Sequence, residues 1–158
     1  MKKFTFFWKI RQPGEIYSQW YIRSFTLDGI TFNCAEQYMM WKKAMLFGDK
    51  ATAAKILAEP KPEKQKELGR SVRPFDTAIW DKACYEIVKA GNLAKFQQNP
   101  DLAAELKSTA PTTLVEASPV DLIWGIGLAA DHPDAQEPTK WRGKNLLGKV
   151  LTEVRDLL

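Results

Sequence analysis

The sequence predicts an α+β protein that is mainly helical and forms a single compact domain over residues 1–158. Helical hydrophobic spacing recurs in several segments, the longest covering residues 77–98. Strand patterns are few and short, at residues 4–8, 25–32 and 112–116. With 158 residues and 45% hydrophobic content, the chain can bury one core but has no room for a second domain.

The N-terminal part is predicted to form short strands before the first helix. Residues 4–8, FTFFW, are expected to form a strand buried on both faces, and a turn follows at Pro13-Gly14. In residues 25–32, Asp28-Gly29 lies between β-forming residues, which is typical of a hairpin. The first helix is then expected to begin at Asn33 or Cys34 and to stop at Gly48.

Helices are predicted for most of the remaining chain, at residues 49–58, 63–68, 77–98, 101–108 and 144–158. Asp76 is the expected cap of the longest helix. Gly91 inside that helix is either tolerated at a cost of ~1 kcal/mol or present because another group packs closely against it. Residues 117–143 have little periodicity but contain three glycines and two tryptophans, which is typical of a functional loop.

Composition limits the classes of function. No segment approaches the ~20 apolar residues that span a bilayer, and the N-terminus lacks the features of a cleavable signal, so we expect a cytoplasmic protein without membrane contact. The net charge of +4 permits contact with nucleic acid but does not establish it. Cys34, Cys84 and His132 cannot fill a four-ligand zinc site without carboxylates, so neither a metal nor a cofactor is expected.

The helix that begins near Asn33 carries an acid and a lysine on one face. At ~100° per residue, one stripe of this helix contains Glu36, Met39, Met40 and Lys43, whereas Lys42 points elsewhere. A carboxylate and an ammonium on a largely apolar stripe are costly to bury unless they pair with each other or meet a polar ligand. Two structural alternatives remain open: both side chains can extend to water, or Glu36 can close a capping box with Asn33.

A second group of candidates lies in the irregular region and just after it. Trp124 stands beside two glycines, where its ring could stack on a planar base with ~1–3 kcal/mol or could fill a core, and Asp121 supplies an acceptor nearby. The GIG sequence lacks the context of a dinucleotide fingerprint. Lys144 and Asn145 begin the last helix and form a candidate seat for phosphate or ribose, and Arg70 belongs to another basic cluster.

Together these residue types suit cleavage of a glycosidic bond to a nitrogen base. Such a reaction passes through an oxocarbenium-like state and needs a carboxylate and a surface that holds the planar leaving group. If the ribose bears an exocyclic amine, the glycosylamine can open to an imine, with which an uncharged Lys43 could exchange to form a Schiff base.

Runs of residues along nearly the whole chain resemble the NADAR superfamily, named for its association with NAD and ADP-ribose. The matching runs are Phe7-Trp8, 18–21, Asp28-Gly29, 35–40, Lys43-Ala44, 47–49, 68–70, Phe75-Asp76, Trp80, 91–96, 114–117, Asp121, 123–127 and 143–148. The resemblance implies a compact, largely helical fold and an N-glycosidase. Its implied substrates are phosphoribosylamino-pyrimidine intermediates of riboflavin synthesis or ADP-ribosylated guanine, including guanine within nucleic acid.

The resemblance also implies roles for individual residues. The key acid falls on Glu36, the helix lysine on Lys43 and the stacking ring on Trp124. The implied substrate-binding set is Asp121, Asn145, Lys144, Arg70, Gln19, Trp20 and Trp80. Gln37 stands where some members have histidine, and Ile126 where some have aspartate, which places the chain nearer the branch associated with ADP-ribosyl-guanine removal. A non-catalytic reader of ADP-ribose and a sequence-tolerant DNA binder are the alternatives, and the sequence leaves the oligomeric state open.

Overall fold

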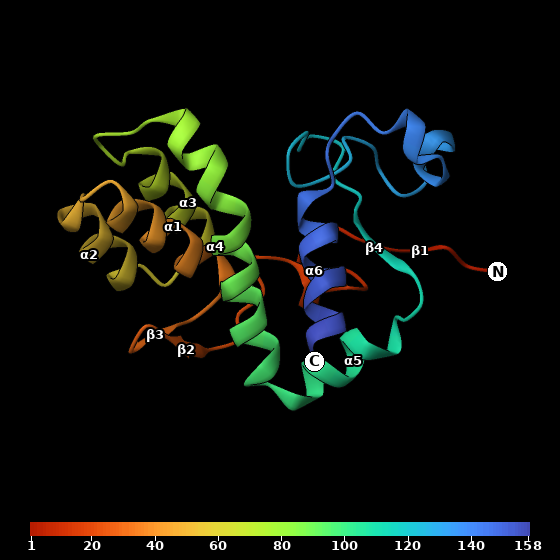
Figure 1. Cartoon of the computed structure of the whole chain (residues 1–158), viewed down its shortest axis with the longest axis horizontal. Coiled ribbons are helices and arrows are strands. Elements are labelled where there is room, and N and C mark those ends of the chain that lie inside the picture. Colours follow the sequence, from red (N-terminus) through yellow and green to blue (C-terminus); the bar gives the residue numbers. More distant parts are fainter. The chain divides into compact units, whose positions relative to one another are not determined.

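The computed structural model describes all residues from 1 to 158, and their contacts group into two compact units. Unit 1 contains Met1–Ser18 and Asn99–Leu158, and unit 2 contains Gln19–Gln98. Six α-helices and four short strands confirm the mainly helical α+β class (Figure 1). The prediction of one domain over residues 1–158 stays a prediction.

Unit 2 opens with the predicted hairpin. Strands β2 (Phe25–Leu27) and β3 (Ile30–Phe32) are antiparallel, with Phe25 opposite Phe32. Asp28 and Gly29 have φ of 54° and 76°, the left-handed pair that a two-residue hairpin turn requires. The hairpin prediction is therefore confirmed.

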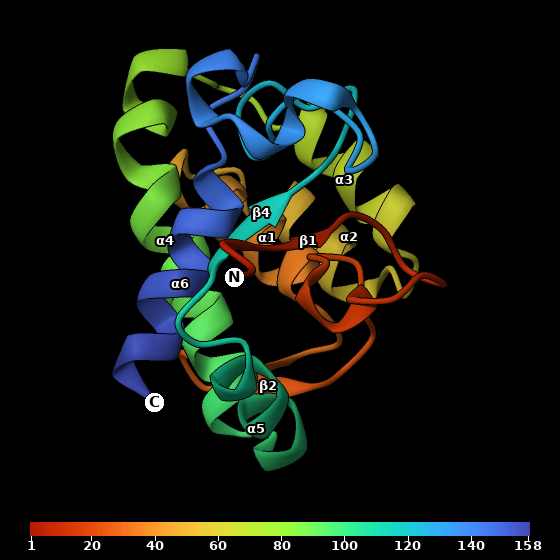
Figure 2. The same ribbon diagram turned by 90° about the vertical axis from the view of Figure 1, so that its right-hand side faces the viewer.

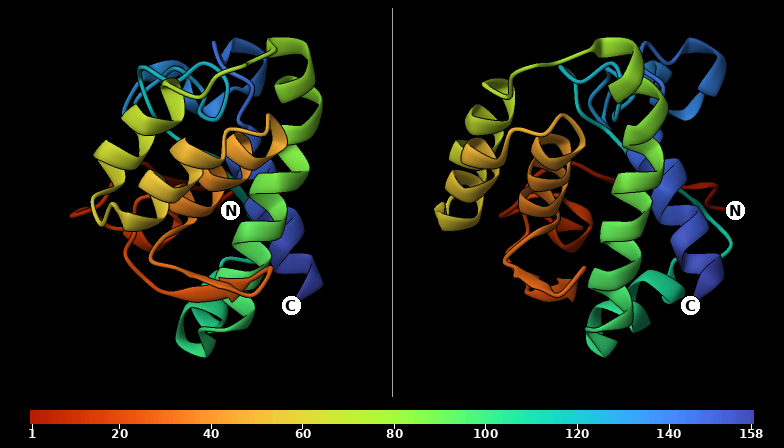
Figure 3. Two further views of the ribbon diagram at one scale, coloured as in Figure 1. Left: turned by 90° about the vertical axis from the view of Figure 1, so that its left-hand side faces the viewer. Right: turned by 60° about the vertical axis from the view of Figure 1, so that its left-hand side comes forward.

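Four helices complete unit 2. The first, α1 (Ala35–Leu46), is contacted by each of the other three, which are α2 (Lys50–Ala58), α3 (Pro62–Arg70) and α4 (Thr77–Gln97) (Figure 3). Asp49 caps α2 through the Thr52 N–H at 3.1 Å, and Asp76 caps α4 as predicted. Because α1 lies among the other helices, eight of its twelve residues are buried.

Two glycines allow the helices around α1 to pack closely. A Cβ on Gly91 of α4 would lie 2.8 Å from the ring of Tyr38, so close packing explains this glycine. A Cβ on Gly69 would overlap Sδ of Met40. Gly69 lies within α3, because this helix continues to Arg70. The prediction that the helix stops at residue 68 is therefore wrong.

Unit 1 contains a two-stranded parallel sheet and two helices. Strand β1 (Phe4–Phe7) pairs with β4 (Thr113–Glu116), placing Phe4 opposite Thr113. Helix α6 (Leu146–Leu157) packs on β4 and contacts α5 (Pro100–Ser108) (Figure 2). Only Phe7 of β1 is buried, because a sheet of two strands cannot cover both faces, so the prediction of a fully buried strand is wrong.

Residues 117–143 form an irregular segment with a small core of its own. Short 3-10 turns cover Pro133–Gln136 and Pro138–Lys140, and a third, near the N-terminus, covers Glu15–Tyr17. The small core consists of Val115, Ala117, Ile126, Leu128 and Ala135, with Trp141 packed against it. The segment is thus a folded loop, as expected. None of the helices in the chain has both the length and the apolar character of a membrane span.

Candidate functional site

The first turn of α1 holds Glu36 in a buried position. The backbone N–H of Glu36 donates to the carbonyl of Gln19 at 2.9 Å, and the side chain is only 6% exposed. The capping-box alternative is wrong for this residue, because the side chain that reaches back to the Asn33 N–H is that of Gln37, at 2.8 Å. The Asn33 N–H is therefore bonded to Gln37.

Lys43 lies further along the same helix, half buried between aromatic rings. Its Nζ is 4.7 Å from the ring centre of Phe75 and 5.6 Å from that of Trp80. Burial lowers the pKa of the Lys43 ammonium, Arg73 and Arg70 lower it further, and Glu36 acts in the opposite direction. A lowered pKa enlarges the neutral, nucleophilic fraction of this lysine near pH 7.

Arg70 is the last residue of α3, and Arg73 lies in the loop that follows. Both are exposed, and Arg73 donates from Nη1 to the carbonyls of Arg70 at 3.2 Å and Val72 at 2.6 Å. The Arg73 backbone N–H donates to Asp49 at 3.0 Å and holds the pKa of that carboxyl below its usual range. Arg73 is thus fixed in its loop, and the exposed guanidinium of Arg70 is the better placed to bind a phosphate.

Gln19 connects the start of unit 2 to the stripe on α1. Its Oε1 accepts from Nδ2 of Asn92 at 2.8 Å, and its Nε2 lies 3.9 Å from Sδ of Met39. Trp20 follows, with Nζ of Lys66 at 6.0 Å from its ring centre. Unit 2 therefore brings together five of the predicted residues, which are Gln19, Glu36, Lys43, Arg70 and Trp80, with Trp20 directly after Gln19 in the chain.

The other predicted residues lie in unit 1. Oδ1 of Asp121 accepts from the backbone N–H groups of Ile123 at 2.9 Å and Trp124 at 2.8 Å, which shapes the loop that carries the half-buried Trp124 ring. The backbone N–H of the exposed Lys144 donates to the Leu122 carbonyl at 3.0 Å. Asp121, Trp124 and Lys144 therefore share one loop cluster.

Asn145 has a different environment from the one predicted. Its side chain is 1% exposed, with Oδ1 accepting from the Glu116 N–H at 3.0 Å and Nδ2 donating to the Leu114 carbonyl at 3.1 Å. Its φ of 54° is left-handed, a conformation that asparagine tolerates. Because both ends of the amide pair with β4, this geometry favours a role in positioning the loop cluster over the direct ligand contact predicted.

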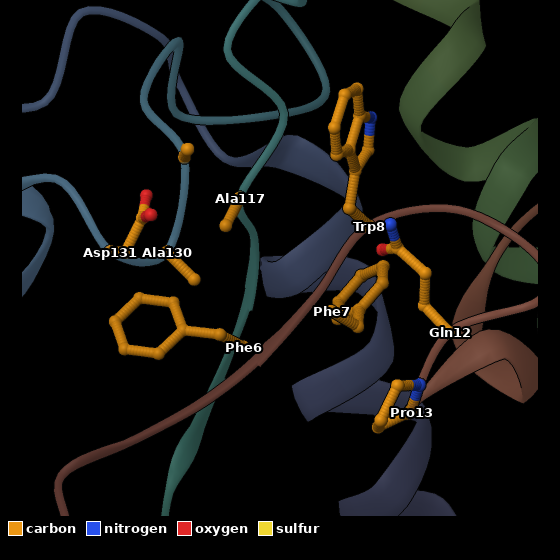
Figure 4. A pocket seen from close by; sticks show the side chains of 9 residues that line it. Phe6, Phe7, Trp8, Gln12, Pro13, Ala117, Ala130 and Asp131 are labelled. Atoms are coloured by element: carbon orange, nitrogen blue, oxygen red, sulfur yellow. The ribbon is translucent and has the colours of Figure 1, made fainter.

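A cavity of about 430 Å³ lies in unit 1, and none of the predicted site residues lines it (Figure 4). Its lining is mainly aromatic and apolar, and consists of Phe6, Phe7, Trp8, Gln12, Pro13, Ala117, Ala129, Ala130 and Asp131. It contains one carboxylate and no lysine, so it cannot supply an acid and an amine to one substrate. No three histidine, cysteine, aspartate or glutamate side chains in the protein are grouped to hold a metal ion.

Two residues with a role in this geometry received none from the sequence. Phe75 covers Lys43, and Asn92 holds Gln19. Both belong to runs that resemble the NADAR superfamily, but an aromatic ring next to a proline and an asparagine inside a helix give no signal of their own. Only the packing of α1 against its neighbours identifies their partners.

Comparison with known proteins bears on the family of the chain. The sequence matches the NADAR domain family over residues 6–158. It is 50% identical over 147 residues to N-glycosidase R617 of Acanthamoeba polyphaga mimivirus, covering 90% of this chain and 86% of that protein. It is 42% identical over 131 residues to protein irg-1 of Caenorhabditis elegans, covering 82% of this chain and 62% of that protein.

A solved structure is also similar. The NMR structure of the E. coli protein YbiA has a TM-score of 0.81 and 26% identity, and covers 98% of this chain and 84% of that one. N-glycosidase YbiA of Escherichia coli K12 is 30% identical over 142 residues, covering 90% of this chain and 78% of that protein. The class expected from the residues, a hydrolase of N-glycosyl bonds, is the class in these relatives' names, and the chain belongs to the NADAR family.

Proposed function

We propose that this protein hydrolyses the bond between a ribose and a nitrogen base, with Glu36 as acid and base and Lys43 acting at the anomeric carbon. The observation that carries the proposal is the buried carboxylate of Glu36 on the same helix as a lysine whose pKa is lowered by burial. An acid and a neutral amine are the two groups that the chemistry of a ribosyl amine requires.

The proposed route conserves atoms and charge. Glu36 protonates the ring oxygen of the ribose, so that the glycosylamine opens to an imine between C1 and the base nitrogen. The neutral amine of Lys43 adds to C1, and the base departs as a free amine while Lys43 keeps C1 as an imine. One water molecule then hydrolyses this protonated imine, and the sugar is released as an aldehyde that can close to its ring form. The surplus proton returns to the Glu36 carboxylate, which leaves Lys43 as the free amine.

The finer proposal concerns the substrate, either an ADP-ribosylated guanine or a phosphoribosylamino-pyrimidine of the riboflavin pathway. Trp124 would stack on the base, with Asp121 shaping its loop. Arg70 and Lys144, both exposed, would bind phosphate. Trp20 and Trp80 would supply further aromatic surface. These assignments are supported by side-chain chemistry and exposure.

The first test replaces Glu36 with Gln and follows release of free base by mass analysis from both candidate substrates. We expect a loss of at least 100-fold in kcat, because an amide cannot transfer the proton. The control is Glu63→Gln, which removes an exposed carboxylate from α3. An unchanged rate on the substrate that the parent cleaves contradicts the role of Glu36. Binding without base release by the parent favours a non-catalytic reader of ADP-ribose.

The second test concerns Lys43. Borohydride added during turnover should reduce the imine and leave the ribosyl mass on the peptide that contains Lys43, and Lys43→Met should abolish this adduct. Lys42→Met is the matched control, because Lys42 is the neighbour that pairs with Asp28 at 3.3 Å. If no adduct forms while base is released, Lys43 acts only through its charge.

A further inference from the structure

Asn92 is a buried residue of α4 that contacts Gln19. Asn92 has no exposed surface, and its Nδ2 donates to two acceptors, the Val88 carbonyl at 2.9 Å and Oε1 of Gln19 at 2.8 Å. Its Oδ1 is buried without a hydrogen-bond partner. Leaving a buried acceptor unpaired is unfavourable, so we infer that Asn92 is kept at this position for the two hydrogen bonds that its amino group donates.

The orientation of the Gln19 amide follows from these contacts. The Val88 carbonyl can only accept, so Asn92 must turn its amino group toward it. The same amino group also donates to Gln19, which must therefore accept through its side-chain oxygen Oε1. The Nε2 group of Gln19 is thereby directed the other way, as a hydrogen-bond donor of fixed orientation.

This donor is near the proposed reaction centre and is weakly occupied. The backbone carbonyl of Gln19 accepts from the Glu36 N–H, so the two residues are neighbours. Nε2 of Gln19 lies 3.9 Å from Sδ of Met39, one turn after Glu36 on the stripe that leads to Lys43. A thioether is a weak acceptor, and an oxygen of a ligand would be a stronger one.

We propose that Asn92 is a positioning residue that fixes Gln19 as a donor to the ring carbonyl of the base, so that the pair selects bases with an acceptor at that point. The proposal rests on the proposed function. A fixed donor discriminates only against groups that cannot accept, and a ring carbonyl is an acceptor-only group. Ribose hydroxyls both donate and accept, so they would not need a fixed amide.

The experiment compares ADP-ribosylated guanine with ADP-ribosylated 2,6-diaminopurine, in which an amino group replaces the ring carbonyl. Both kcat/KM and the calorimetric Kd are measured for the parent, Gln19→Glu and Asn92→Leu. The control is Gln97→Glu, the same change of charge at an exposed position of α4. Thermal melting is followed for every variant.

We expect the parent to prefer the carbonyl substrate by roughly 10- to 100-fold. Glu at position 19 keeps its contact with Asn92 but presents an acceptor, so its preference should reverse toward the amino analogue. Leu at position 92 frees the Gln19 amide to turn over, so the preference should narrow to about threefold or less. Gln97→Glu should keep the parental ratio.

A parental ratio in Gln19→Glu overturns the proposal, and this variant decides the matter alone if Asn92→Leu fails to fold. A failure of the proposed function has a different signature, because the parent would then release no base from either compound. In that event the ratio of the two Kd values still tests Gln19 and Asn92, since discrimination in binding does not require cleavage.

Discussion

A fully buried lysine should make the stability of this protein depend on pH in a window that can be calculated. Lys95 of α4 has no exposed surface, and burial lowers the pKa of its ammonium from 10.5 to about 7, with Arg23 adding to the effect and Cys34 opposing it. Between these two pKa values the unfolded chain binds a proton that the folded chain does not. The free energy of unfolding must therefore rise with pH.

The magnitude follows from the same two values. From pH 7 to pH 8.5 the gain in the free energy of unfolding should be about 1.5 kcal/mol, with a slope that approaches ~1.4 kcal/mol per pH unit. Burial raises the pKa of the Cys34 thiol from 9.0 to about 12, which opposes this gain only as the pH approaches 9 and above. The window below pH 8.5 therefore reports mainly Lys95.

The assay is urea unfolding followed by circular dichroism at half-unit steps from pH 7 to 8.5, for the parent, Lys95→Met and Lys82→Met. Lys82 is an exposed lysine of the same helix, so its variant should keep the parental slope. Lys95→Met should lose most of this slope and keep only the smaller rise that the lowered pKa of Lys43 contributes. The slope is the readout, because the substitution also removes the contacts of Lys95 with Tyr21 and Phe96. A parental slope in Lys95→Met refutes the reasoning.

Three further predictions concern packing and the lysine of the site. Gly148→Ala should lower the free energy of unfolding by ~3 kcal/mol or more, because its Cβ would overlap the Leu114 carbonyl, whereas exposed Lys149→Ala should change it by less than ~0.5 kcal/mol. Gly91→Ala should lower the free energy of unfolding by ~1–3 kcal/mol, since the Tyr38 ring must move. Urea unfolding measures this free energy for both glycine variants. Arg73→Gln removes a charge that lowers the pKa of Lys43, so the alkaline rise of kcat/KM should move to higher pH; an unmoved profile would remove Lys43 as the titrating nucleophile.

Elements with strong local signals could be predicted from the sequence. Asp28-Gly29, the cap Asp76 and the glycine after α1 all depend on interactions within a few residues, and the structure places each as expected. The extent of α3 could not be predicted, because Gly69 is favoured there by a contact with Met40 that is distant in sequence. The exposure of β1 depends on how many strands join the sheet, which its own residues do not specify.

The candidate site could also be predicted only in part from the sequence. Helical spacing alone places Glu36 and Lys43 on one stripe of α1, and the structure adds the electrostatic influence of Glu36 on Lys43. Spacing could not show that Gln37, not Glu36, closes the helix start, since both are one turn from Asn33 and only the geometry chooses between them. Nor could it show that both ends of the Asn145 amide pair with β4, because strand and residue are separated by about thirty positions of irregular chain.

The surroundings of Lys43 suit the reaction proposed for an anionic substrate. In the proposed reaction Arg70 and Arg73 would attract phosphate, and their positive charge lowers the pKa of the Lys43 ammonium, so one set of groups would favour both binding and a neutral nucleophile. Glu36 opposes the second effect while it is ionised, and this opposition ends when Glu36 takes up a proton. Protonation of the acid and deprotonation of the lysine therefore favour each other, which is the pair of states that opening of a glycosylamine and attack by an amine require.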